Sequence, residues 1–152
     1  MKKRFSLIPF IALLFSLFVI GKSTVAADET TYEIGTDITF APFEFQNEDK
    51  EYVGIDIDLL KAIAKDQSFQ VNLRPLGFDT SIQAVQSGQV AGMIAGMSIT
   101  DERKQSFDFS DPYFESGIQM AVKADNHSIK SYEDLKGKTV AAKVSTESAT
   151  FL

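Results

Sequence analysis

Short stretches of alternating apolar and polar residues recur along this chain, separated by stretches with helical spacing. Alternation is typical of half-buried strands, whereas apolar residues three and four positions apart form one face of a helix. We predict strands at residues 32–36, 69–73, 90–95, 117–122 and 139–144, and a hairpin joining 43–45 to 52–53. Predicted helices cover residues 54–67 and 79–87, short runs from 100 and from 131, and a start at 145–146.

Local signals support several of these helices. Thr100 is suited to an N-cap, and Asp79 or Thr80 is expected to cap the helix that ends before Gly88. Residues 131–134 read Ser-Tyr-Glu-Asp, which matches a capping box. We interpret Asp56 in the helix at 54–67 as a first-turn residue that complements the helix dipole, not as a metal ligand.

The order of these elements predicts an α/β architecture with helices packed on mainly parallel sheets. In such sheets, ligands bind beyond the carboxyl ends of the strands. Residues suited to gripping a small zwitterion follow four of the predicted strands. They are Asp37 and Phe40 after the first, Phe78 after the second, Gly96, Met97, Ser98 and Arg103 after the third, and Lys143 and Thr146 after the last.

The group at residues 98–103 is the most informative of these. Arg103 offers a planar fork that matches two carboxylate oxygens, and Ser98 offers a hydroxyl donor. A surface arginine at a helix start is the alternative. Phe40 and Phe78 could enclose an aliphatic or amide side chain, or they could simply pack in the core.

Two more candidates have equally ordinary alternatives. Gly96 would let the backbone approach a ligand closely; the alternative is that it serves only sheet packing. Asp37 could accept a hydrogen bond from a ligand's amide or ammonium group, or it could be a turn residue.

The first 27 residues have the layout of a secretory signal peptide. Three basic residues at 2–4 precede an apolar run at 5–20, and small and polar residues follow at 21–27. We expect cleavage after Ala26 or Ala27, and we prefer Ala27. An uncleaved membrane anchor is the alternative, although the apolar run is short for a membrane span.

Without this segment, the chain is strongly acidic. The segment holds four of the 15 basic residues and none of the 21 acidic ones, so 11 basic and 21 acidic residues remain, a net charge of −10. This charge disfavours nucleic acids and anionic membranes as partners. Cysteine is absent, so neither a disulfide framework nor a lipoprotein anchor is expected.

No motif for catalysis or cofactor binding stands out. The single histidine, His127, lies in a polar loop, and neither a Ser/His/Asp set, a phosphate loop nor a zinc spacing is present. We therefore expect no catalytic residue, no metal site and no cofactor.

Five stretches carry a family resemblance. They are residues 35–45, 53–59, 95–104, 107–111 and 134–138, which read GTDITFAPFEF, VGIDIDL, AGMSITDERK, FDFSD and DLKGK. On these stretches the chain resembles the bacterial extracellular solute-binding proteins of family 3, the amino-acid receptors of ABC transporters. The resemblance implies two α/β lobes that close around an amino acid. Lobe 1 would span residues 28–112, the hinge crossing 113–117, and lobe 2 would begin at 118.

The resemblance also implies roles for the candidate residues. Phe40 and Phe78 would flank the ligand, and Asp37 would lie near its side chain. Gly96, Ser98 and Arg103, with Met97 among them, would hold the α-amino and α-carboxylate groups, while Lys143 and Thr146 would act from lobe 2. The loop after Lys143 departs from the family's Gly-Thr-Gly-like pattern, and Glu147 brings a negative charge close to it.

The expected function is capture of a polar amino acid by hinge closure for an ABC permease in the membrane, without catalysis. Phe40, Phe78 and the pair Ala95-Gly96 look most like the glutamine-binding members. We expect an exported protein in the periplasm or on the outer face of the cytoplasmic membrane, monomeric at full length. The chain reads as part of a longer protein and is expected to bind weakly or not at all by itself. The alternatives are a receptor fused to its permease, a sensor ectodomain and a periplasmic dehydratase.

Overall fold

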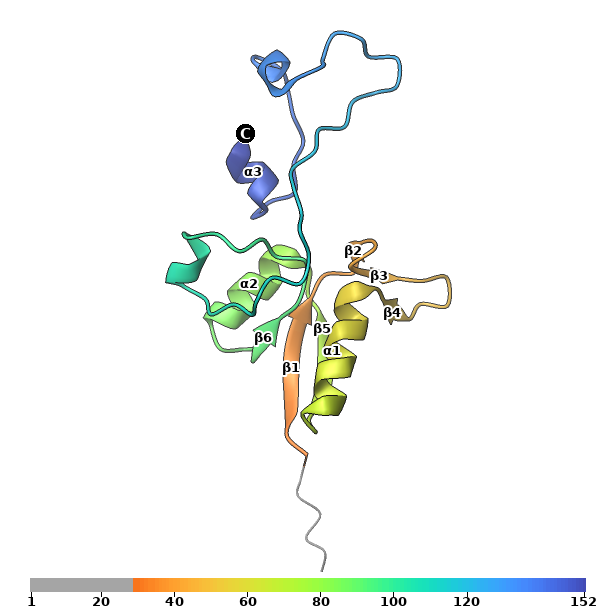
Figure 1. Ribbon diagram of the computed structural model, residues 1–152, viewed down its shortest axis with the longest axis vertical. Helices are drawn as coiled ribbons and strands as arrows, with labels where there is room; N and C mark the ends of the chain where they lie inside the picture. The colour runs from red at the N-terminus through yellow and green to blue at the C-terminus, as the bar shows by residue number, and fades with distance from the viewer. Residues whose placement is uncertain (1–28) are drawn as a thin grey trace, which may run out of the picture.

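A small parallel sheet organises the chain. The computed structural model describes residues 29–152, so the predicted signal peptide lies outside the described residues. In this sheet, β1 (Thr31–Thr36) lies between β5 (Gln70–Pro75) and β6 (Gly92–Met93), and both neighbours run parallel to it (Figure 1). The sheet agrees with the predicted α/β architecture.

Two helices pack on this sheet. Helix α1 (Ile55–Asp66) contacts β5, and α2 (Phe78–Gln86) contacts β1 and β6. The core combines a few large side chains with small ones that let the helices approach the sheet closely. Its buried apolar residues are Phe43, Ile57, Ala64, Phe78, Ala84, Val90 and Ala95.

Helix α2 begins earlier than predicted. Gly77, with a φ of 85°, is its N-cap, and the carbonyl of Gly77 accepts a hydrogen bond from the amide of Ser81 at 3.0 Å. The prediction of Asp79 or Thr80 as cap is therefore wrong, and Asp79 lies in the first turn instead. Glycine takes the cap position because its positive φ turns the chain sharply out of β5.

A second, antiparallel sheet follows β1. It consists of β2 (Thr39–Phe40), β3 (Glu44–Gln46) and β4 (Tyr52–Val53) in the order β2-β3-β4. The pairing of β3 with β4 confirms the predicted hairpin. Strand β2 adds Phe40 opposite Glu44.

Three predicted strands differ from the structure. Strand β6 is shorter than residues 90–95, because the amide of Val90 donates to the carbonyl of Ala84 at the end of α2 rather than to a neighbouring strand. Residues 117–122 and 139–144 form no strand. A strand needs a partner for its backbone groups, and within residues 29–152 neither run has one.

The short helices lie near their predicted positions. The run from Thr100 becomes the 3-10 helix η1 (Arg103–Gln105), and the capping box of Ser131 and Asp134 is present at η2 (Tyr132–Leu135). Helix α3 (Glu147–Phe151) begins after Thr146. None of the helices within residues 29–152 is long and apolar enough to cross a membrane.

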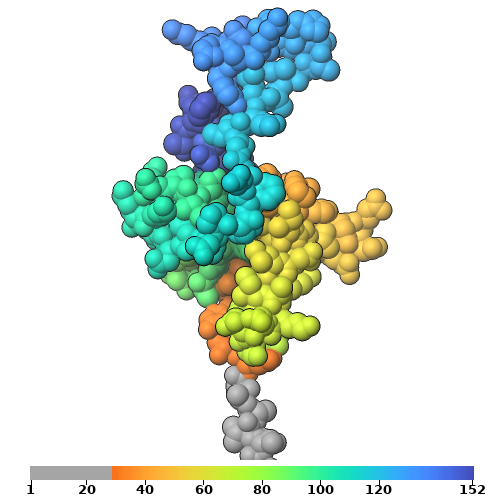
Figure 2. All heavy atoms as spheres, in the orientation of Figure 1, coloured from red at the N-terminus to blue at the C-terminus, as the bar shows by residue number. Residues whose placement is uncertain are grey.

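The chain divides visibly along its long axis. Residues 29–112 form the part that we call the body, and residues 118–152 form the distal segment. The crossover segment, residues 113–117, joins them. Figure 2 shows the blue distal segment standing beyond the body, with α3 in violet turned back toward it. This return brings the start of α3 close to the strand ends of the body.

Candidate ligand-binding site

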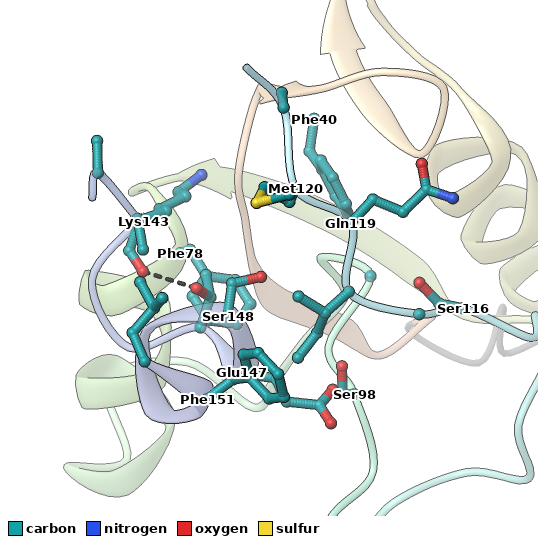
Figure 3. A pocket seen from close by; sticks show the side chains of 18 of the residues that line it. Phe40, Phe78, Ser98, Ser116, Gln119, Met120, Lys143, Glu147, Ser148 and Phe151 are labelled. Atoms are coloured by element: carbon teal, nitrogen blue, oxygen red, sulfur yellow. Dashed lines mark hydrogen bonds between the residues drawn. The ribbon is translucent and has the colours of Figure 1, made fainter. Parts of the chain in front are cut away.

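A cavity of about 420 Å³ lies between the body and the distal segment. This is a size typical of small-molecule sites. The strand-end residues of the body line one side, and residues 116–121, 140–143 and 146–148 line the other. All the predicted site residues except Met97 contribute to its wall. Figure 3 shows Phe40 and Lys143 reaching this space from different parts of the chain.

Arg103 lies in this cavity wall beside Phe78. Thr100 holds the start of its turn, since the Thr100 hydroxyl accepts a hydrogen bond from the Arg103 amide at 3.2 Å. The guanidinium donates from Nη1 to the Ser98 carbonyl at 2.8 Å and from Nη2 to the Ser145 carbonyl at 2.9 Å. Its central carbon is 6.0 Å from the centroid of the Phe78 ring. The guanidinium thus faces the cavity, and the Ser98 carbonyl fixes its orientation.

The two predicted aromatic walls differ in exposure. Phe78 is 8% exposed at the first position of α2, whereas Phe40 is 45% exposed. The Phe40 ring stacks on Phe43, with centroids 5.1 Å apart and an interplanar angle of 22°. Phe40 therefore has one supported face and a large exposed surface available to a ligand.

Gly96 packs directly against this aromatic wall. Its φ is 52°, in the left-handed region that disfavours side chains with a Cβ. A Cβ built on Gly96 would lie 2.9 Å from Cε1 of Phe40. The position thus requires glycine for two independent reasons.

Asp37 and Lys143 form an ion pair across the cavity. Asp37 is 4% exposed, and its Oδ1 accepts hydrogen bonds from the Ile38 amide at 2.7 Å and the Thr39 hydroxyl at 3.0 Å. Burial by itself raises the pKa of Asp37, but the hydrogen bonds from Lys143, Ile38 and Thr39 outweigh it and lower that pKa below its ordinary value. Asp37 is therefore ionised and already paired.

Two predicted residues take other positions or partners. Met97 lines a smaller cavity of about 80 Å³ beside Tyr113 and Phe114, because the turn at Gly96 directs it away from the larger one. Thr146 lines the large cavity as the N-cap residue of α3, but its hydroxyl donates to the Lys143 carbonyl at 2.6 Å. That hydroxyl is therefore already engaged.

Sequence reasoning missed three residues in or behind the cavity wall: Glu44, Asp56 and Tyr113. Asp56 was interpreted as a first-turn residue of α1, yet the structure buries it completely. Glu44 is only 1% exposed and lines the cavity. One signal was available, because Glu44 stands between Phe43 and Phe45 in a short strand, where a charged side chain calls for a specific partner.

No group of three His, Cys, Asp or Glu residues within residues 29–152 is arranged to hold a metal ion. The chemistry of the cavity comes instead from a guanidinium, an ion pair, aromatic rings and backbone groups. This combination suits reversible binding of a small charged molecule.

Comparison with known proteins gives consistent results. The arginine-binding extracellular protein ArtP of Bacillus subtilis (strain 168) is 34% identical over 146 residues, which are 95% of this chain and 56% of ArtP. A solved structure described as an ancestral arginine-binding protein bound to glutamine is 50% identical, with a TM-score of 0.78 over 82% of this chain and 56% of that chain.

Substrate-binding domain 2 of Lactococcus lactis GlnP, in an open conformation, is 50% identical, with a TM-score of 0.58 over 83% of this chain and 54% of that chain. The chain spans about half the length of the curated relatives it matches. These relatives are named as binding proteins rather than enzymes. The family profile described as "Bacterial extracellular solute-binding proteins, family 3" matches residues 32–151, and this chain therefore belongs to that family.

Proposed function

We propose that this chain supplies a ligand-binding cleft for a polar α-amino acid, with glutamine as the preferred ligand, in an amino-acid ABC importer. The observation that carries the proposal is the convergence of Arg103, Phe40 and the Asp37–Lys143 pair on one cavity of about 420 Å³. No group in this set is placed for catalysis, and the proposed role is capture and release.

Arg103 would bind the α-carboxylate of the ligand. Its Nη1 is engaged by the Ser98 carbonyl, while Nη2 bonds to the exposed Ser145 carbonyl. A carboxylate is a stronger acceptor for a guanidinium than a neutral carbonyl is, because it carries the opposite charge and can accept two parallel hydrogen bonds from the fork. The ligand would therefore displace the Ser145 contact, and the Ser98 contact would hold the fork in position.

The Asp37–Lys143 pair supports a neutral polar side chain as the preferred ligand group. An amide can accept from Lys143 and donate to Asp37 at the same time. The guanidinium of arginine would instead have to compete with Lys143 for a carboxylate that is already neutralised. Glu44 adds no second anion at neutral pH, because burial and the neighbouring Asp56 raise its pKa to about 9.

Hinge closure is the proposed mechanism. Residues 28–112 would form lobe 1, residues 113–117 the crossing and residues 118–152 part of lobe 2. A ligand that contacts both lobes stabilises the closed state by its differential affinity for that state. An ABC permease in the membrane would receive the ligand outside the cytoplasm, after export directed by residues 1–27. Similarity to a substrate-binding domain of GlnP also favours a version in which the receptor is one domain of a larger transporter.

A ligand screen tests this proposal directly. The full-length protein that the gene encodes should be titrated by calorimetry with glutamine, glutamate, arginine and histidine, with melting temperature as a second measurement. We expect glutamine to bind most tightly. A response to arginine and histidine alone would overturn the glutamine preference, and no response to any amino acid would overturn the proposed function.

Substitution of Lys143 by methionine should change the ligand preference. Methionine keeps much of the side-chain length but removes the charge, so Asp37 is left ionised without its partner. We expect the affinity for glutamine to fall about 10-fold or more, as for loss of one partner of a charged pair, while the affinity for arginine falls less or rises. Lys138→Met is a matched control on an exposed residue outside the cavity. Equal losses for both ligands would contradict the assignment.

A further inference from the structure

One buried carboxylate joins the ligand-binding loop to the crossover segment. Oδ2 of Asp56 accepts a hydrogen bond from the backbone amide of Gly96 at 2.7 Å, and Oδ1 accepts one from the Tyr113 hydroxyl at 2.9 Å. Asp56 is 0% exposed, so water does not compete for these bonds. Three segments far apart in the sequence therefore meet at this one side chain.

A second carboxyl group, that of Glu44, lies beside the carboxylate of Asp56. Glu44 is 1% exposed, and neither of its oxygens accepts a hydrogen bond from any group in residues 29–152. Burial is the main reason that the pKa of Glu44 rises to about 9, and contact with Asp56 adds to it. Glu44 is thus protonated at neutral pH and can donate its proton to Asp56, which leaves one negative charge on the pair.

We infer that Asp56 is a positioning residue for ligand binding, and that the proton held between Glu44 and Asp56 keeps the Gly96 loop fixed relative to the crossover segment. The inference rests on the proposed function, since it concerns the same cleft. It assigns to Glu44, which lines the cavity, and to Asp56, which lies behind it, a role that depends on the two carboxyl groups sharing one proton.

The aromatic residues above this pair support the same connection. Phe43 stacks on Phe40 of the cavity wall and meets Phe114, next to the crossover segment's Tyr113, edge to face with centroids 4.9 Å apart. A shift of the Gly96 backbone would move the surface against which Phe40 rests. Disruption of the carboxyl pair should therefore weaken ligand binding in two ways, by displacing the Gly96 loop and by displacing the Phe40 ring.

The carboxyl pair of Glu44 and Asp56 should lose its shared proton at alkaline pH and then no longer hold the Gly96 loop in place. The titratable and charged groups that face Glu44 are Asp56 on α1, Asp37 after β1, Tyr113 of the crossover segment and Lys143 of the distal segment. Burial and the negative charge of Asp56 raise the pKa of Tyr113, so its hydroxyl keeps its proton. Once Glu44 loses its proton, two adjacent carboxylates repel each other, and the amide of Gly96 loses its fixed acceptor.

The stability of the ligand-free chain should also decrease as pH rises. The folded chain keeps the Glu44 proton up to a pKa of about 9, whereas the unfolded chain releases it near the ordinary value of 4.5. The folded state then binds more protons between these values, so this contribution to stability is present in full below pH 4.5 and falls as pH rises toward 9.

The test compares four variants of the full chain with the wild type: Glu44→Gln, Glu44→Ala, Asp56→Asn and Tyr113→Phe. Glutamine affinity is measured by calorimetry from pH 7 to pH 10, and melting temperature from pH 5 to pH 9. At pH 7 we expect losses of about 10-fold or more for Asp56→Asn and Glu44→Ala and a smaller loss for Tyr113→Phe. Glu44→Gln should restore most of the affinity that Glu44→Ala loses, because an amide can donate to Asp56.

The pH profile separates a positioning role from a merely structural one. Wild-type affinity should fall more steeply above pH 9 than that of Glu44→Gln, although the ligand's own ammonium titrates equally in both. The decline of melting temperature with pH should likewise be shallower in Glu44→Gln. Asp58→Asn is the control, because Asp58 shares the first turn of α1 but is exposed. Parallel pH profiles for the wild type and Glu44→Gln would overturn the inference, as would wild-type affinity in Asp56→Asn.

Hydrogen exchange at the Gly96 amide provides a readout that needs no ligand. We expect faster exchange in Asp56→Asn and in the wild type above pH 9, relative to Glu44→Gln, after correction for intrinsic exchange rates. If no amino acid binds the wild type, the proposed function fails, while this exchange pattern still decides the inference. Exchange at Gly96 that is unchanged in a folded Asp56→Asn or Tyr113→Phe variant would refute the link.

Discussion

Replacement of Arg103 by alanine is expected to weaken glutamine binding by about 30-fold or more. Loss of one partner from a charged, hydrogen-bonded pair costs roughly 2–5 kcal/mol, and each 1.4 kcal/mol corresponds to a factor of 10. The guanidinium faces the cavity, with Nη1 bonded to the Ser98 carbonyl and Nη2 bonded to the exposed Ser145 carbonyl. Calorimetric titration of the full chain with glutamine measures this loss.

Two further variants serve as controls, Arg103→Lys for the geometry of the guanidinium and Lys104→Ala for the loss of a nearby positive charge. Lysine keeps the positive charge but lacks the planar fork, so Arg103→Lys should recover only part of the affinity. Lys104 is adjacent in η1, but its ion pair with Asp101 is exposed, and it does not line the cavity. Lys104→Ala should bind like the wild type, since exposed pairs contribute little. Binding by Arg103→Ala within 3-fold of the wild type would remove Arg103 from the site.

Substitution of Gly96 by alanine is expected to lower glutamine affinity by about 10-fold or more. The new Cβ would lie 2.9 Å from Cε1 and 3.1 Å from Cδ1 of Phe40, so the ring that forms the cavity wall must move. The φ of 52° adds strain of order 1–2 kcal/mol for a residue with a Cβ. Either response, displacement of Phe40 or rotation of the Gly96 peptide, alters the surface presented to the ligand.

Gly88→Ala separates the steric effect from backbone strain. Gly88 also has a positive φ, 71°, but a Cβ there has no atom within 4 Å. We expect this control to lower the melting temperature while leaving glutamine affinity unchanged. Joint measurement of melting and binding distinguishes the two variants. Equal affinity of Gly96→Ala and Gly88→Ala would show that contact with Phe40 does not shape the site.

Most of the body follows from local patterns. Strand β1, helix α1 and the hairpin of β3 and β4 lie where the periodicity predicts them, because each is defined by short-range alternation, helical spacing or turn residues. The capping box at η2 is local for the same reason. Helix α2 begins earlier than its sequence predicts, because its cap is the sharp turn at Gly77 rather than a polar side chain at residue 79 or 80.

The distal segment shows the limit of such patterns. Residues 117–122 and 139–144 have the composition of strands, yet strand formation depends on hydrogen bonds to another strand. No ladder within residues 29–152 includes either run. The periodicity of a segment indicates whether its residues are suited to a sheet, but it does not indicate whether another strand lies beside the segment.

Motifs and periodicity in the sequence are enough to indicate the family, the α/β class and the strand ends at which Asp37, Phe78 and Arg103 stand. These properties depend on motifs and on the fixed relation between parallel strands and their carboxyl edge. The contact between Glu44 and Asp56, and the hydrogen bonds by which Asp56 joins Gly96 to Tyr113, depend instead on how the chain packs in three dimensions. Contacts of this kind link residues 40 and 57 positions apart. They arise from how the hairpin, α1 and the crossover segment pack together, which no local pattern records.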